Sequence, residues 1–169
     1  MSVVTFEDKL TIPEGVTDHA SFRAWACSDQ FPERGRVSWL AGEIWVDLSP
    51  ESLFTHNQVK GAICITLGRL ARRSRLGYFF HDRTLLSHEG AGLSTEPDGL
   101  FIAYDSVRAG RVRWVKGAEA EIEVEGTPDM VLEVVSKSSR RKDTKTLRKL
   151  YWDAGIAEYW LVDALSGEA

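Results

Sequence analysis

An ionisable side chain lies inside the most apolar segment of the chain. The segment runs from Pro128 to Ser136 and reads Pro-Asp-Met-Val-Leu-Glu-Val-Val-Ser, a composition that predicts a buried strand. A buried carboxylate must be paired with a cation, bound to a metal ion or neutralised by a raised pKa. Glu133 therefore needs a partner, and the residues that could partner it are the first candidates for a functional site.

Two further acids have comparable surroundings. Glu43 begins a predicted strand after a turn, and Asp98 follows a proline and leads directly into the apolar segment Gly99–Ala103. If these strands are neighbours, Glu43, Asp98 and Glu133 converge at one edge of a sheet, where their charges repel unless a hard cation joins them. Mg²⁺ prefers such oxygen ligands. A metal ion held there could activate a water molecule and stabilise charge on a phosphate.

Each acid also has a simpler explanation. Taken alone, Glu43 is a surface acid at a turn, Asp98 is a turn or cap residue after a proline, and Glu133 is one half of a structural ion pair. Asp129 shares a strand face with Glu133 by alternation. It is either a fourth ligand or a residue that orients the turn at the mouth of the strand.

Lysines in the segment after Glu133 could supply a cation. Lys142, Lys145 and Lys149 recur at i, i+3 and i+7, on one side of a predicted helix. One of them could point back to the carboxylates and hold a water molecule or a phosphate oxygen. Lys137 is closer in sequence but lies in a serine-rich turn. The alternative for the whole set is a solvated helix face.

The net charge of −4 gives the chain no overall footprint for nucleic acid. The basic residues are nevertheless clustered, and each cluster taken alone is typical of a solvated face. The first cluster falls within thirteen residues and consists of Lys137, Arg140, Arg141, Lys142, Lys145, Arg148 and Lys149. The second lies at the end of a predicted helix and consists of Arg69, Arg72, Arg73 and Arg75.

Other residues with catalytic potential have weaker support. His56 begins the longest predicted helix, where a histidine is typically a cap or surface residue. Ser136, Ser138 and Ser139 lack a Gly-x-Ser-x-Gly elbow, so we interpret them as turn and N-cap residues. The chain contains no P-loop, dinucleotide fingerprint or zinc motif.

Hydrophobic periodicity places the candidates on regular elements. Residues 55–74 form the clearest helix, with Val59, Ala62, Ile63, Thr66, Leu67 and Leu70 predicted to face the core. Gly155 is placed to end a helix over 142–154 as a left-handed cap. The remaining elements are a helix over 17–27, a hairpin of 36–41 and 43–48, and strands over 78–80, 99–104, 111–115, 120–124, 129–135 and 157–163.

This order of elements predicts an α/β fold, with a mixed α+β sheet flanked by helices. Residues 129–163 form a strand, helix, strand unit whose two strands should be parallel in a right-handed crossover. We expect a single domain over 1–169 with a helical lead-in over 1–34. Cys27 and Cys64 are predicted to be buried, reduced thiols. Without a membrane-length apolar run or a signal-peptide pattern, a cytoplasmic location is expected.

The motifs together resemble the Uma-two (Uma2) family of restriction endonucleases in the PD-(D/E)XK superfamily. The resemblance runs from about residue 35 to the end and is most specific in the final third. It is carried by Gly42-Glu43, His56, Pro97-Asp98, Pro128–Ser136, Lys142-Asp143, Tyr151, Ala154–Ile156 and Glu158–Asp163.

The resemblance implies a restriction-endonuclease-like core and Mg²⁺- or Mn²⁺-dependent cleavage of DNA phosphodiesters. By position, Glu43 resembles the first acid, Asp98 the aspartate of the PD motif and Glu133 the acid of the second motif. The lysine usual two residues later is replaced by Val135. The resemblance implies a basic residue from the following helix instead, with Lys142 the first candidate and Lys145 the second.

The wider set of contacts is also an expectation at this point. DNA phosphates would be held by Arg140, Arg141, Lys149 and His56. The resemblance implies further strands after Asp163, so we expect either a short member of the family or a truncated one. A missing closing strand would leave an exposed sheet edge, which favours pairing into a homodimer.

Two other functions compete with the nuclease. A catalytically impaired DNA-binding or assembly module would keep the fold without an effective lysine. A glycosidase with two carboxylates would leave the basic clusters and the final third of the chain unexplained.

Overall fold

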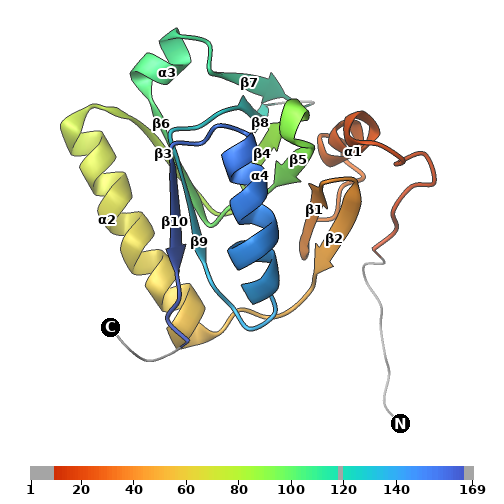
Figure 1. The fold of residues 1–169 in the computed structure, drawn as a ribbon, viewed down its shortest axis with the longest axis horizontal. Helices are drawn as coiled ribbons and strands as arrows, with labels where there is room; N and C mark the ends of the chain where they lie inside the picture. The colour runs from red at the N-terminus through yellow and green to blue at the C-terminus, as the bar shows by residue number, and fades with distance from the viewer. Residues whose placement is uncertain (1–9, 118–119, 166–169) are drawn as a thin grey trace.

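The computed structural model describes residues 10–117 and 120–165, and it contains two mixed β-sheets flanked by helices (Figure 1). The first sheet has the order β2-β1-β5-β4-β8-β7, in which only β4 and β8 are parallel. Its strands are β1 (Arg36–Leu40), β2 (Glu43–Asp47), β4 (Leu85–His88), β5 (Leu93–Thr95), β7 (Val112–Lys116) and β8 (Glu121–Gly126).

The second sheet has the order β10-β9-β6-β3. Its strands are β3 (Gly77–His81), β6 (Gly99–Ala103), β9 (Met130–Val134) and β10 (Glu158–Val162). The expected parallel pairing of the last two strands is confirmed, since Glu158 is in register with Met130. The helix between them ends at Asp153 with Ala154 as its C-cap, and Gly155 has the predicted left-handed conformation with φ +70°.

Four α-helices in the described residues flank the sheets. They are α1 (His19–Ala26), α2 (Gln58–Ser74), α3 (Tyr104–Arg108) and α4 (Arg148–Asp153). Wide π-helical turns precede α2 and α4, at Leu53–Asn57 and Lys142–Leu147, and a 3₁₀ turn spans Glu89–Ala91. None of the helices in the described part of the chain is long and apolar enough to cross a membrane.

Alternate residues of β9 face two hydrophobic clusters. Val131 packs with Leu147 and Tyr151 of the α4 region, in a cluster that also includes residues of the first sheet. Met130 and Leu132 pack on the other side with Cys64 of α2. Glu133 is two residues after Val131, so it faces the α4 side of this sheet.

The hydrophobic stripe of α2 is shifted from the predicted one. Ile63 and Leu67 pack on the sheet as predicted, whereas Leu70 is exposed, and the buried residues include Lys60 and Ala71. The predicted position of the buried face of α2 was wrong, because a hydrophobicity pattern places a lysine on the solvent face. Lys60 is instead buried, with its ammonium group in ion pairs. Both cysteines are free; Cys64 is buried as predicted, whereas Cys27 is only half-buried.

The hairpin that carries part of the site has a two-residue turn. Ala41 and Gly42 both have positive φ, of 53° and 92°, as in the tight turns that match strand twist. Leu40 pairs with Glu43 beside this turn, and Arg36 pairs with Asp47 at the open end of the hairpin. The two ends of the hairpin therefore serve different parts of the molecule.

Candidate active site

Asp98 and Glu133 lie beside each other on adjacent antiparallel strands. Gly99 of β6 is in register with Leu132 of β9, so the next pair outward is Asp98 and Glu133, on one face of the sheet. The backbone N–H of Val134 donates to Asp98 Oδ2 at 2.8 Å. Both carboxylates are buried, with exposed fractions of 1% and 2%. The central pair of the predicted acid cluster is therefore assembled.

A cavity of about 220 Å³ opens onto this pair. Its walls come from the start of β1, the segment between β2 and α2, the end of β9 and the π-helical turn before α4. Charged groups dominate the lining, among them Arg36, Glu51, His56, Asp82, Lys142 and Asp143.

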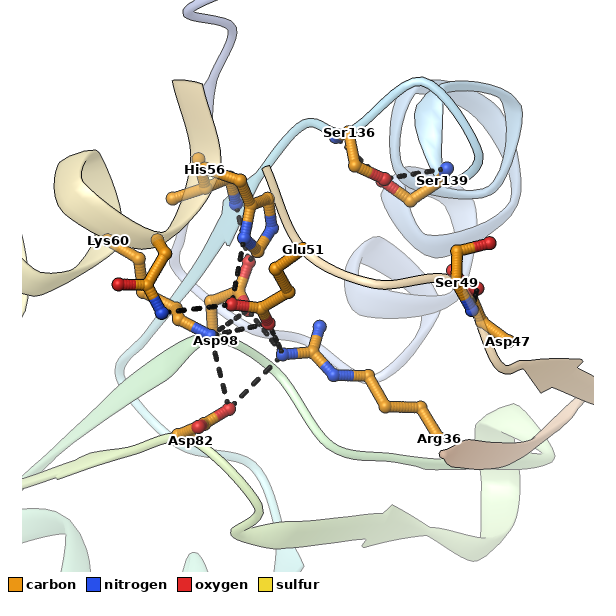
Figure 2. A network of polar contacts seen from close by, with 12 residues as sticks. Arg36, Asp47, Ser49, Glu51, His56, Lys60, Asp82, Asp98, Ser136 and Ser139 are labelled. Atoms are coloured by element: carbon orange, nitrogen blue, oxygen red, sulfur yellow. Dashed lines mark hydrogen bonds and ion pairs between the residues drawn. The ribbon is translucent and has the colours of Figure 1, made fainter. Parts of the chain in front are cut away.

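Asp98 is surrounded by basic groups (Figure 2). Arg36 Nη2 donates to its Oδ1 at 3.0 Å, and His56 Nε2 lies 3.5 Å from its Oδ2. Burial by itself opposes ionisation, but the contact with His56, the charge of Arg36 and the N–H of Val134 together lower the pKa of Asp98. The same contact raises the pKa of His56, although burial opposes it.

Two cations are shared among three acids at this point. Arg36 contacts Glu51 Oε1 at 2.8 Å and Asp82 Oδ1 at 3.1 Å, besides Asp98. Lys60 Nζ donates to Glu51 Oε1 at 2.7 Å and lies 3.8 Å from Asp98 Oδ1. Figure 2 shows Arg36 and Lys60 reaching the acids from opposite sides. The negative charge of the cluster is largely balanced by the chain itself.

Glu133 has a different environment. The hydroxyl of Tyr151 donates to Glu133 Oε1 at 2.6 Å. Burial raises the pKa of Glu133 to about 8; the charge of Lys142 opposes this, whereas Asp98 and Asp143 add to it. Without a further cation, Glu133 therefore keeps its proton to a higher pH than an exposed glutamate does. Asp98 and Glu133 are thus neighbouring carboxyl groups whose pKa values are shifted in opposite directions.

Lys142 is the lysine that lines the cavity. Its Nζ lies 3.6 Å from Asp143 Oδ1, and its side chain is mostly buried. Asp143 is itself 1% exposed, and burial raises its pKa. An ammonium group is thus held close to Glu133, as the sequence predicted for one of the three lysines.

The donor groups fit a divalent cation. Glu51, His56 and Asp98 each offer one ligand atom, and these atoms all lie within 4.8 Å of one another. His56 Nδ1 is buried and has no hydrogen-bond partner, although Glu51 Oε2 is 3.4 Å away. Two carboxylates with one imidazole suit Mn²⁺, which accepts nitrogen ligands more readily than Mg²⁺.

Glu43 is not brought to this cavity. It is exposed and lies beside the hairpin turn, opposite Leu40, whereas Arg36 and Asp47 form the end of the hairpin at the site. Glu43 and Asp47 are four residue steps apart along β2, about 13 Å at the usual rise. The expected convergence of Glu43 with Asp98 and Glu133 is therefore wrong. Glu51, in the segment after β2, supplies an acid instead.

The remaining basic candidates lie on the surface. Lys145 and Arg141 are exposed, Arg140 pairs with Asp163 at 2.7 Å, and Lys149 pairs with Asp153. Lys142, Lys145 and Lys149 were predicted on one side of an α-helix, but Lys142–Leu147 is a π-helical turn, and of these three lysines only Lys142 lines the cavity.

The candidates at turns have structural roles. Asp129 accepts hydrogen bonds from the N–H of Ala103 and the hydroxyl of Ser106, so it orients the start of β9. Ser136 and Ser139 each accept a hydrogen bond from the other's backbone N–H, which confirms them as turn residues.

Four charged site residues were not predicted from the sequence. Unlike Glu133, none of Arg36, Glu51, Lys60 and Asp82 interrupts an apolar strand, so no local pattern marked them. One signal was available: His56 and Lys60 are four residues apart, on one face of a helix, and an acid stands five residues before His56. Tyr151 was predicted only as part of the family resemblance. Its contact with Glu133 was not predicted, because it depends on how α4 packs.

The family Uma2, described as "Putative restriction endonuclease", matches the chain over residues 20–168. The chain belongs to this family. A crystal structure with the same fold as this Uma2 chain is that of "a putative nuclease belonging to DUF820" from Anabaena variabilis, with a TM-score of 0.63 and 19% sequence identity. The alignment covers 86% of this chain and 73% of that one.

No curated protein matches this Uma2 chain. The predicted family and the mixed α/β, restriction-endonuclease-like fold are both confirmed. Val135, at the position of the usual lysine, is completely buried, and its N–H donates to the carbonyl of Val162. In this chain a basic group must therefore reach the carboxylates from elsewhere.

Proposed function

We propose that this Uma2 chain is a metal-dependent endonuclease that hydrolyses DNA phosphodiester bonds. Family membership supports a nuclease role. The observation that carries the proposal is the pair of Asp98 and Glu133, buried side by side at a cavity that Lys142 also lines. Paired carboxylates with a nearby ammonium are the groups that phosphodiester hydrolysis with a divalent cation requires.

The cation would be Mg²⁺ or Mn²⁺, held by Asp98 and Glu133 with Glu51 and His56. When bound, it would supply an activated water molecule and neutralise charge on the scissile phosphate. Asp98 is suited to this role because its lowered pKa keeps it ionised. Glu133 can join it once its proton leaves, and Tyr151 then holds one of its carboxylate oxygens in place.

Lys142 and His56 have separate roles in the proposal. The ammonium group of Lys142 orients the attacking water or contacts a phosphate oxygen from the side of Glu133. His56 lies against Asp98, so it fixes that carboxylate. Because the same contact raises its pKa, the imidazole must lose its proton before it can hold the cation. Lys145 is exposed and is not assigned a role at the reacting centre.

Contacts with DNA outside the cavity remain part of the proposal. Arg140, Arg141 and Lys149 lie on the surface near the turn and helix that follow β9, where they could contact phosphates without reading sequence. A homodimer would bring two such sites to the two strands of a duplex.

The test is cleavage of supercoiled plasmid with Mg²⁺, Mn²⁺ or EDTA. Wild type and Glu43→Gln should nick the plasmid with metal only, whereas Glu133→Gln should lose about 100-fold or more of the rate, as when a group at the reacting centre is removed. Glu43→Gln is the matched control because it removes an exposed acid. Equal rates for wild type and Glu133→Gln would contradict the proposal.

A non-cutting DNA-binding or assembly module is the second candidate. It is favoured by the balance of charge, since Arg36 and Lys60 already pair with the acids, and by Val135 in place of lysine. Salt-sensitive DNA binding without cleavage under any metal would support it. Mn²⁺ binding measured separately would show whether the carboxylates retain a cation site.

A further inference from the structure

A larger groove leads away from the carboxylates between α2 and β3. Its volume is about 690 Å³, and one wall is a face of α2 from Asn57 to Arg72. At 1.5 Å per residue this wall is about 22 Å long. Asp82 and Asp98 line both this groove and the 220 Å³ cavity. The groove therefore opens directly onto the proposed active site.

Two glycines keep the α2 wall low. Gly61 and Gly68 both line the groove. A β-carbon at Gly61 would meet no atom within 4 Å, and one at Gly68 would lie 3.7 Å from the ring of Phe79. Neither position needs glycine for its backbone, and glycine weakens a helix interior. Their effect is an open channel along the helix.

The same wall carries positive charge beyond the acidic end. Arg69 and Arg72 line the groove and are exposed, and neither forms an ion pair with any residue that the structure describes. Lys60, nearer the carboxylates, is paired with Glu51 and Asp82. The two arginines are therefore available to an anionic chain that leaves the site along α2.

Aromatic rings stand at the rim of the groove, along the outer edge of β3. Phe79 is the ring of β3 that packs toward α2, so its neighbour Tyr78 projects to the other face of this edge strand. Tyr78 and Tyr104 border the groove, with ring centroids 5.0 Å apart in an edge-to-face arrangement, and Tyr78 is 46% exposed. Tyr78 also contacts Trp114, with ring centroids 5.7 Å apart, and both rings line a neighbouring hollow of about 530 Å³. Exposed aromatic rings beside basic groups are the combination on which unpaired bases stack.

We propose that this groove binds a single strand of DNA and guides it to the carboxylates, with its phosphates on Arg69 and Arg72 and its bases toward Tyr78 and Tyr104. The inference rests on the proposed nuclease function. The groove is narrow, because its volume of about 690 Å³ is spread over a length of about 22 Å. A duplex, whose major groove alone is about 12 Å wide, does not fit in it, whereas one extended strand does.

An acidic peptide added to the free edge of β3 is the other occupant to consider. Basic residues alone would suit it, but it would not use the aromatic rings. Single-stranded DNA uses the arginines and the rings, and it presents a phosphodiester at the end where the proposed chemistry lies.

Fluorescence anisotropy of the full chain in EDTA tests the binding without cleavage. Labelled oligodeoxythymidine should bind tighter than a duplex of the same length. Arg72→Ala should weaken binding about fivefold and lower the salt slope by about 0.7. Arg73→Ala is the matched control, because it removes an exposed arginine of the same helix that does not line the groove; it should change affinity less than twofold.

A second measurement locates the strand even where a variant folds poorly. Oligonucleotides carrying 5-iodouracil, irradiated on the wild type, should crosslink to Tyr78 or Tyr104. Crosslinks elsewhere, equal effects of Arg72→Ala and Arg73→Ala, tighter binding of the duplex, or preferential binding of polyglutamate would overturn the inference. Duplex cleavage with metal but no groove binding would contradict the groove and leave the nuclease proposal intact. Groove binding without cleavage would contradict the nuclease proposal and leave the groove.

Discussion

The guanidinium of Arg36 and the carboxylate of Asp98 meet at 3.0 Å, although the two residues belong to different sheets. Arg36 is the first residue of β1 in one sheet, and Asp98 immediately precedes β6 in the other. The contact closes the cavity on the side of the hairpin. It also places a permanent cation where the proposed metal ion would bind, so the chain and the metal share the same carboxylate oxygens.

Replacing Arg36 should therefore affect stability and metal binding in opposite directions. Arg36→Gln leaves Asp98 buried without its guanidinium partner, which should cost about 3 kcal/mol of unfolding free energy without metal. The same change should tighten Mn²⁺ binding because a competing cation is gone. Urea unfolding with and without Mn²⁺ measures both effects. Arg113→Gln, at an exposed ion pair with Glu125, should cost less than about 1 kcal/mol.

The lysine assignment separates two neighbours on one segment. Lys142→Ala should reduce metal-dependent nicking by about 100-fold, as when a group at the reacting centre is removed. Lys145→Ala should retain the wild-type rate, because that side chain is exposed. The comparison uses nicking rates at saturating Mn²⁺, with circular dichroism to confirm that both variants fold. A larger loss in Lys145→Ala would move the role to the second lysine.

The stability of the metal-free protein should fall as the pH rises from about 4.5 to 8. The pKa of Glu133 is raised in the folded state, from 4.5 to about 8, so the folded protein holds a proton that the unfolded chain releases in this range. Its contribution is complete below the unfolded pKa and is lost as the pH rises through the folded pKa. Glu133→Gln keeps a neutral side chain and should remove this part of the slope.

Thermal unfolding in EDTA at several pH values measures this effect. Glu133→Gln should be more stable than wild type near pH 8, and the difference should shrink near pH 5. Glu43→Gln, which changes an exposed carboxyl, should follow the wild-type curve. An identical pH profile for wild type and Glu133→Gln would show that Glu133 is ionised in the folded protein.

His56 should determine the choice of metal ion. Its unpartnered Nδ1 and the neighbouring carboxylates suit Mn²⁺ better than Mg²⁺. His56→Ala should weaken Mn²⁺ binding about tenfold and leave Mg²⁺ binding within about threefold. Electron paramagnetic resonance measures Mn²⁺ directly, and competition with Mg²⁺ gives the second affinity. Equal losses for both ions would mean that the imidazole acts only by holding Asp98.

Local pattern was sufficient for the part of the site on the second sheet. Glu133 was recognised because a charged residue interrupts an apolar strand, and Asp98 because a proline and an apolar run bracket it. Their proximity follows from two strands that pair edge to edge. The strand, helix, strand unit over 129–163 was also predictable, since its periodicities change cleanly from strand to helix and back.

The rest of the site depends on contacts between distant parts of the chain. Arg36 and Asp98 are 62 residues apart, and nothing local marks Arg36 as a partner of a buried acid or Lys60 as buried. Strands β4 and β5 were missed for a related reason. Ser87, Ser94 and Thr95 are buried in them, and hydrogen bonds such as that between Ser38 and Thr95 take the place of the apolar alternation by which strands are recognised.

The two-residue turn at Ala41-Gly42 has an effect far from where it lies. β1 is held on its other side by β5, so one inserted residue in the turn would displace β2 and exchange the faces of all its side chains. The segment that begins at Asp47 would start from the wrong face, and Glu51 would no longer meet Arg36 and Lys60. A change in the length of this turn would thus alter the charge of the cavity without replacing any residue that lines it.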